Sequence, residues 1–289
     1  MRADGSATVN GSATVAIRMD GPPLEGVTAP AGGPPVTRRP GGDGPPGLVE
    51  GISLAMGALT WELAARIWDP AWLPPLTRVL ASTDDIVRDG ALGALSSTAY
   101  IFVLGLMAAM AAAIVTTVIF TLVPVVHRLA RPYFYMAMAV PPLAVVPFFM
   151  LIWGPSLTAR VATVWLFTYF VLAVMATEAL EHSPRDLRDM AFSYGGRRLS
   201  VLRTVAIPAA TPRLLEALRI AVVRGIKGAV NAELIIGVVG VGRLLRSYSA
   251  GYRIEHLYAT VLLVLVASLI TYFLIERLER KATGWERSG

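Results

Sequence analysis

Charged residues are scarce in this sequence, and cysteine is missing from it altogether. Asp, Glu, Lys and Arg make up 16% of the 289 residues, whereas soluble domains carry about 25%. Hydrophobic residues reach 55%, and the mean hydropathy is +0.59. Because the apolar residues gather in several long runs, the composition predicts a polytopic membrane protein. The absence of cysteine excludes disulfides and thiolate metal sites.

Lysine is nearly absent as well, and this bears on the energy source. The two lysines are Lys227 and Lys281, and neither follows a glycine. A phosphate-binding loop needs Gly-Lys followed by Ser or Thr, so the chain is not by itself a conventional P-loop ATPase. We expect no cofactor on this chain; if ATP drives it, a partner subunit binds the ATP-Mg.

The remaining polar residues favour neither catalysis nor nucleic-acid binding. The three histidines are scattered without metal-ligand spacing, and no nucleophile, base and acid have a sensible arrangement, so we expect no metal site and no enzymatic activity. The net charge is +6, but the basic residues lie between the apolar runs, without the interleaved aromatics of a nucleic-acid surface. The expected environment is the lipid bilayer.

Three segments differ in composition. Residues 1–48 are rich in Gly and Pro and bury nothing, so they predict a disordered cytoplasmic tail. The stretch has no apolar core behind a basic start and is therefore not a signal peptide. Residues 49–282 form the predicted transmembrane domain, and 283–289 form a C-terminal tail.

The apolar runs predict an all-α fold, a polytopic transmembrane helical bundle of about six spans. Prolines, including Pro141 and Pro142, interrupt the third run, and a spanning helix tolerates them only where neighbours or a cavity satisfy the freed carbonyls. After the fifth run, Gly237, Gly240 and Gly242 predict an external re-entrant turn. The expected spans cover 51–68, 91–123, about 132–153, 161–180, 214–239 and 256–275.

A polar, arginine-rich segment between the fourth and fifth spans predicts a docking element. A short helix is expected over 185–194, and Gly195 and Gly196 can take the left-handed conformation that ends it. A second short helix is expected over 197–206, with Pro208 closing the motif. Two short helices at an angle form a knob that can enter a cleft on a soluble partner.

The spacing in this segment resembles the "EAA" loop of ATP-binding-cassette (ABC) importer permeases: Glu-Ala-Ala, three residues, Gly, nine residues, Ile-x-Leu-Pro. Asp replaces the Glu and Met the first Ala, which preserves charge sign and apolarity but weakens any claim about a particular ATPase. Two longer stretches, AVPPLAVVPFFMLIWG and ALRIAVVRGIKGAVNAELIIGVVGVGRLL, resemble the nitrate/sulfonate/taurine (binding-protein-dependent) type. The coupling residues implied by the resemblance are Asp189, Met190, Ala191, Gly195, Gly196, Val205, Ile207 and Pro208.

The resemblance, which covers roughly 51–280, implies the permease subunit of a type I ABC importer. It implies a second copy of the chain, with the pathway at the two-fold axis, and two ATPase subunits docked at the coupling loop, residues 184–207. A periplasmic or lipid-anchored binding protein would deliver a small polar or anionic solute. Closure of the ATPases on ATP would push the two knobs together and turn the pathway from inward- to outward-facing.

Ionisable residues in the fifth span are candidates for the pathway, since charge at that depth is costly unless paired or facing water. Arg224, Lys227 and Asn231 are spaced to share a helix face that attracts an anion. Alternatively, Arg224 or Lys227 pairs with Glu233 or Glu216 and locks the bundle. An ion-coupled secondary transporter, the alternative function, would use Lys227 with Glu233. The candidate pathway residues are Pro141, Pro142, Arg224, Lys227, Asn231 and Glu233.

The distribution of arginine predicts the orientation. If the chain crosses the membrane six times with the docking loop inside, most of the arginines lie in the inner segments. This is the positive-inside asymmetry of membrane proteins. The expected location is the cell membrane, multi-pass, with both termini cytoplasmic.

Overall fold

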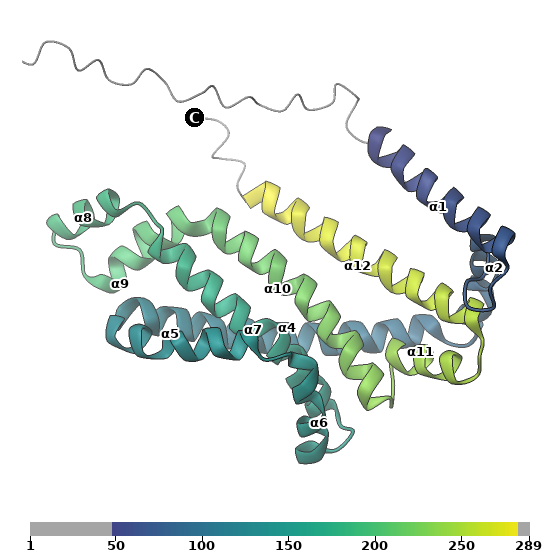
Figure 1. The fold of residues 1–289 in the computed structure, drawn as a ribbon. Helices are drawn as coiled ribbons and strands as arrows, with labels where there is room; N and C mark the ends of the chain where they lie inside the picture. Colours follow the sequence, from purple (N-terminus) through teal and green to yellow (C-terminus); the bar gives the residue numbers. More distant parts are fainter. Residues whose placement is uncertain (1–47, 283–289) are drawn as a thin grey trace, which may run out of the picture. The chain divides into compact units, whose positions relative to one another are not determined.

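The computed structural model describes residues 48–282, in two compact units (Figure 1). The first unit is Met1–Ser53, whose described part begins helix α1 (Leu48–Trp68); the second, Leu54–Gly289, holds the rest of α1 and all the other helices. The tails predicted over 1–48 and 283–289 lie, apart from Leu48, outside the described residues.

Helices make up nearly all of the described chain, as the apolar runs predict, and residues 48–282 contain no strand. After α1 they are α2 (Leu76–Ala81), α3 (Thr83–Arg88), α4 (Ala91–Leu122), α5 (Pro124–Ala139), α6 (Pro142–Trp153), α7 (Leu157–Glu181), α8 (Arg185–Ser193), α9 (Arg198–Val201), the π-helical turn η1 (Leu202–Ala206), α10 (Ile207–Ile236), α11 (Val241–Ala250) and α12 (Ile254–Ala282).

Within 48–282, three helices are long and apolar enough to cross a membrane: α4, α7 and α12. Two bent pairs raise the number to five if each is one span: α5 with α6, and the run from Arg198 to Ile236 with α11. The remaining predicted span, 51–68, forms helix α1 but carries the ion pair of Glu62 with Arg66, at 2.6 Å. The spacing of these two residues, four apart in the sequence, allows this pair on one face of α1.

Prolines divide the third predicted span into two helices. The chain bends by 92° between α5 and α6. Val140 and Pro141 are extended there, with ψ of 127° and 113°, because a residue followed by proline is pushed out of the helical region. A single interrupted span over 132–153 is therefore replaced by two helices that run in nearly perpendicular directions.

Small residues allow α4, α7 and α10 to pack side by side (Figure 1). A Cβ on Gly105 of α4 would lie 2.5 Å from the Cβ of Val164, and one on Gly228 of α10 would lie 2.9 Å from that of Phe167. Close approach through glycine and alanine is how helices gain packing energy in a bilayer, where hydrophobicity does not drive them together. Helix α10, one of these three, carries the candidate pathway residues Arg224, Lys227, Asn231 and Glu233.

Helix α10 connects two ends of the second unit. It begins at the α8–α9 segment and ends at α11 (Figure 1), and its 30 residues span about 45 Å. At the α11 end, α2, α3 and the start of α12 pack around a core that includes Val79, Ile86 and Tyr248. The two ends are therefore separated by about the thickness of a membrane.

Candidate functional site

The α8–α9 segment forms the compact knob that the spacing predicts, and we call residues 184–207 the coupling loop. Helix α8 ends at Ser193, and Gly195 follows with a φ of +82°, in the left-handed region. The Gly196 N–H then donates to the Ala191 carbonyl at 3.0 Å. This is the glycine-dependent helix ending that satisfies a free terminal carbonyl.

The two glycines are required for different reasons. Gly195 has open space around its missing side chain, so its backbone conformation is what favours glycine. A Cβ on Gly196 would lie 2.7 Å from the Ala191 oxygen and 2.8 Å from Val201 Cγ2. Gly196 therefore lets α8 and α9 approach each other, and both positions specify the shape of the knob.

The outer surface of the knob exposes apolar side chains within a basic segment. Met190, Tyr194 and Leu199 are 56%, 86% and 62% exposed, and Asp189 is exposed beside them. Ala191 is only half-buried and Ile207 is exposed. Large apolar residues gathered on a small protruding element are typical of an interaction surface.

The inner side of the knob is anchored to the bundle. Leu202, Ala206 and Ala210 are buried against Ala179 and Leu180 of α7. The guanidinium of Arg198 donates to the Leu122 carbonyl, at 3.2 Å, where α4 ends. A cation at a helix C-terminus satisfies a free carbonyl and interacts favourably with the helix dipole, so the knob is tied to α4 and α7.

The exit from the knob differs from the expectation. Pro208 was predicted to close the motif, but the chain stays helical from Arg198 through the π-helical turn η1 into α10, with Pro208 in its first turn. A proline in a continuous helix removes one hydrogen bond and crowds the carbonyl four residues before it. The wider turn η1 ends at Ala206, two residues before Pro208, and contains the crowded carbonyl of Thr204, so it provides the extra room for the proline ring in the first turn of α10. Val205 lies within η1 and is half-buried.

Helix α10 has two contrasting faces. Ala221, Gly225 and Gly228 are buried, and Gly225 packs against Phe102 of α4. Arg224 and Lys227, spaced to share the opposite face, are exposed, and Asn231, one turn further, is half-buried. The predicted face shared by these three residues is consistent with this burial.

A pocket brings two of the predicted pathway residues together. It has a volume of about 220 Å³ and lies at the bend between α5 and α6, with Arg224 and Pro142 both in its lining. Pro141 begins the bend but does not line it. Sequence reasoning missed the aromatic wall of this pocket, Phe167 and Phe170 of α7.

Glu233 does not pair with either basic residue, contrary to both alternatives raised for it. Its side chain is fully buried, and the Thr98 hydroxyl donates to it at 2.6 Å. The backbone N–H of Gly242 donates to the same carboxylate oxygen at 3.2 Å, and the Val241 N–H donates to the Thr98 hydroxyl at 3.1 Å. Glu233 therefore fastens α11 to α4, and the Lys227–Glu233 pair that an ion-coupled transporter would use is absent from the described residues.

The glycines of the 237–242 turn make room for this carboxylate. Gly237, with a φ of +69°, ends α10 and Gly240 precedes α11, as a bent turn predicts. A Cβ on Gly240 would lie 1.9 Å from Glu233 Oε1, and one on Gly242 would lie 2.4 Å from the Glu233 backbone. The turn can wrap the carboxylate because its residues near it lack side chains. We call Thr98, Glu233 and the Gly240–Gly242 segment the Glu233 clasp.

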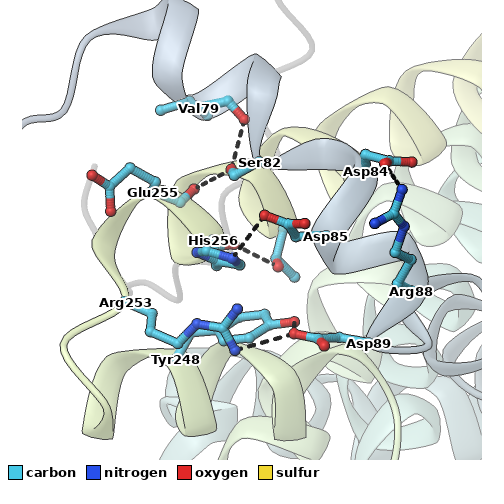
Figure 2. Close-up of polar contacts among 11 residues, drawn as sticks. Val79, Ser82, Asp84, Asp85, Arg88, Asp89, Tyr248, Arg253, Glu255 and His256 are labelled. Carbon is cyan, nitrogen blue, oxygen red and sulfur yellow. Dashed lines mark hydrogen bonds and ion pairs between the residues drawn. The ribbon is translucent and has the colours of Figure 1, made fainter.

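A second polar cluster joins α3 to the start of α12 at the α11 end (Figure 2). The Tyr248 hydroxyl donates to Asp89 at 2.9 Å, and Arg253 donates to the same oxygen at 3.1 Å. The hydrogen bond from Tyr248, helped by the charge of Arg253, lowers the pKa of the Asp89 carboxyl below its ordinary range. His256 faces Asp85 at 3.7 Å, so this end carries exposed carboxylates. Among residues 48–282, no group of three or more His, Asp or Glu is placed to hold a metal ion.

Comparison with known proteins gives this architecture a family. A family model described as "Binding-protein-dependent transport system inner membrane component" matches residues 101–284. The chain is 24% identical to a formylaminopyrimidine transport permease of Halalkalibacterium halodurans, over 78% of this chain and 91% of that one. It is 25% identical to the taurine transport permease of Escherichia coli, over 81% and 90%.

A riboflavin transport permease of Chloroflexus aurantiacus is 30% identical over 54% of this chain, and the match spans 59% of that protein's length. The fold resembles the MetNI methionine ABC transporter in inward-facing conformations, with a TM-score of 0.60 at 17% identity, covering 66% of this chain and 95% of that one. Several of the described helices are long and apolar enough to cross a membrane, and the family match covers more than half of the 289 residues. The chain therefore belongs to the binding-protein-dependent transport system inner membrane components, the permease subunits of ABC importers.

Proposed function

We propose that the coupling loop, residues 184–207, docks this permease on an ATPase subunit and transmits ATP-driven movement to the pathway. The observation that carries the proposal is the exposure of Met190, Tyr194 and Leu199 on a knob whose inner side is anchored. A cleft on a partner that covers these side chains gains hydrophobic contact, while the exposed charges of Asp189 and Arg197 give it orientation.

Charge supports placing the knob and both termini in the cytoplasm. The knob end carries the exposed arginines Arg128, Arg131 and Arg197, whereas at the α11 end the exposed arginines Arg88 and Arg253 are paired with the carboxylates Asp84 and Asp89. Basic residues accumulate on the cytoplasmic side of inner membrane proteins. The α11 end then faces outward, where a periplasmic or lipid-anchored binding protein would deliver the solute.

The exposed face of α10 supports a second copy of the chain. Arg224 and Lys227 lie in a membrane-crossing helix and are exposed in the single chain, which is costly in hydrocarbon. A homodimer whose two α10 faces surround a water-filled pathway removes that cost. Such a dimer carries two knobs, hence two ATPase subunits, and the ATP-Mg is bound there because this sequence has no phosphate-binding loop.

The transported solute is proposed to be small and polar or anionic. The basic residues Arg224 and Lys227 on the proposed pathway face favour negative charge. The relatives are named as transport permeases for formylaminopyrimidine, taurine and riboflavin, and these names support a small polar solute for this chain. The carboxylates Asp84 and Asp85 belong to α3, at the α11 end, and are not part of the α10 face that carries Arg224 and Lys227.

The proposal is tested by comparing two glycine substitutions with the same backbone cost. Gly195 and Gly90 both have positive φ, +82° and +89°, and open space around the α-carbon. Gly195→Asp should abolish co-purification of the ATPase and solute-coupled ATP hydrolysis, while leaving the protein in the membrane. Gly90→Asp, at the far end of α4, should retain both. Normal uptake by the Gly195→Asp protein would refute the assignment of the coupling loop.

A further inference from the structure

The pocket at the α5–α6 bend has features of a binding site for part of the solute. Its volume is about 220 Å³, smaller than the roughly 300–1,000 Å³ of pockets that enclose drug-sized ligands. It therefore suits a compact molecule or one end of a larger one. Its lining includes Met138, Pro142, Leu166, Phe167, Phe170 and Arg224.

Arg224 is the one charged residue in that lining. Its side chain is exposed in the single chain and has no hydrogen bond or ion pair with any described residue. A guanidinium at membrane depth is stable only beside water or an anion. The planar fork of its N–H groups matches the oxygens of a carboxylate, sulfonate or phosphate. An anionic group is therefore the complementary partner.

Phe167 and Phe170 form a wall of the pocket that is held in place. They are three residues apart on α7 and share a face. Phe170 contacts the rings of Phe134 and Tyr169, at centroid distances of 5.4 and 4.9 Å. Phe167 is pressed against Gly228 of α10, where an added Cβ would lie 2.9 Å away. Because neighbouring residues hold these rings in place, they can stack on a flat ligand with little loss of side-chain conformational entropy.

The bend adds hydrogen-bond acceptors. Ala137 and Met138, in the last turn of α5, line the pocket. The last four carbonyls of a helix have no partner within it, and Pro141 and Pro142 prevent the chain from continuing to supply one. The Val140 N–H satisfies the Met136 carbonyl at 3.3 Å. An N–H or O–H group on a bound solute would find acceptors in the same turn.

We propose that this pocket is a subsite of the translocation pathway that binds a solute with an anionic group attached to a flat, ring-like body. Arg224 binds the anionic group, and Phe167 and Phe170 contact the flat body. The inference rests on the proposed function, because it places the exposed face of α10 in the pathway. It names a narrower class of solute than small and polar or anionic.

Binding of three probes to the full complex with its ATPase, in lipid nanodiscs, tests this by calorimetry. Benzenesulfonate carries both features, methanesulfonate carries only the anion, and benzamide carries only the flat ring. Benzenesulfonate should bind more tightly than either of the others. Arg224→Gln should weaken benzenesulfonate about tenfold or more, as expected for a lost charge-assisted hydrogen bond, and leave benzamide unchanged. Phe170→Leu should reduce benzenesulfonate toward the affinity of methanesulfonate.

The matched control is Arg213→Gln, the same change on the same helix. Arg213 is exposed and does not line the pocket, and it lies 11 residues, about 16 Å, along α10 from Arg224. Equal weakening by both variants would show a general electrostatic field and overturn the subsite.

Failure of the subsite is distinguishable from failure of the proposed function. If the wild-type complex keeps its ATPase and binds none of the three probes, the subsite is refuted and the coupling proposal stands. If no ATPase associates with the wild-type chain, the coupling proposal is refuted, and the probes are then measured on the chain alone.

Discussion

Replacing Glu233 tests whether the Glu233 clasp holds α11 in place. Leucine at this position removes both hydrogen bonds that the carboxylate accepts. The Thr98 hydroxyl keeps an acceptor, because it also lies 3.0 Å from the Ala94 carbonyl. The Gly242 N–H, buried with the clasp, keeps none. An orphaned buried donor costs about 1–3 kcal/mol.

A second effect adds to this cost. The guanidinium of Arg160, nine-tenths buried, acts electrostatically on Glu233, and leucine leaves that cation without its counter-charge. We therefore expect Glu233→Leu to destabilise the protein by about 2 kcal/mol or more. For a chain of this size each kcal/mol lowers the melting temperature by about 2–4 °C, so the expected drop is at least about 4 °C.

Glu233→Gln separates the two effects. The amide oxygen can replace the carboxylate oxygen that accepts from Thr98 and Gly242, so the hydrogen bonds survive while the charge is lost. Glutamine should cost about half as much as leucine or less. The measurement is thermal unfolding of the purified protein in detergent, for both variants and the wild type. If Glu233→Leu melts with the wild type, the clasp contributes nothing and the reasoning is wrong.

Two further predictions concern the two ends of the second unit. Arg198→Gln removes the guanidinium that donates to the Leu122 carbonyl and ties the knob to α4. Solute-stimulated ATP hydrolysis by the complex should therefore fall, while basal hydrolysis by its ATPase persists. Unchanged stimulation would contradict the role of this contact. At the other end, Asp89 has a lowered pKa in the folded protein. The stability that its ionised carboxylate contributes is therefore fully present above the ordinary aspartate pKa of about 3.9, and it is lost as the pH falls through the lower pKa of the folded state. The melting temperature of the wild type should therefore drop on acidification below about pH 4, and Asp89→Asn should flatten that drop; equal acid slopes would contradict the role of the Tyr248 contact.

Length and hydropathy were enough to predict most of the helices. The runs at 91–123, 161–180 and 256–275 correspond within a few residues to α4, to α7 and to the apolar span Ile254–Arg277 of α12, because a long apolar stretch has few alternatives to a helix in a bilayer. The knob was also predictable, since Gly195 and Gly196 mark a helix ending whatever surrounds them. Both features, the length of an apolar run and glycine at a helix end, depend only on neighbouring residues, so a single sequence is enough to predict them.

The partners of buried polar groups were not predictable in the same way. One of the alternatives from the sequence paired Glu233 with a basic residue on its own helix, yet its partner Thr98 is 135 residues away in the sequence. A threonine in an apolar run gives no sign of this contact, because most threonines in helices bond to the preceding turn, as Thr163 and Thr168 do. The continuation of the helix through Pro208 was missed for a similar reason, since only the structure shows that η1 accommodates the ring.

Helix α10 connects the proposed coupling loop, the Arg224 pocket and the Glu233 clasp. Its buried face is rich in glycine and alanine and packs closely against α4 and α7, with Phe102 against Gly225 and Phe167 against Gly228. The π-helical turn η1 lies between the knob and α10, and π turns inside helices are frequent at functional positions. Glu233 restrains the other end through Thr98 and Gly242. In the proposed mechanism, movement of the knob enters α10 at η1, and the stretch between η1 and Glu233 that would rotate or tilt contains Arg224.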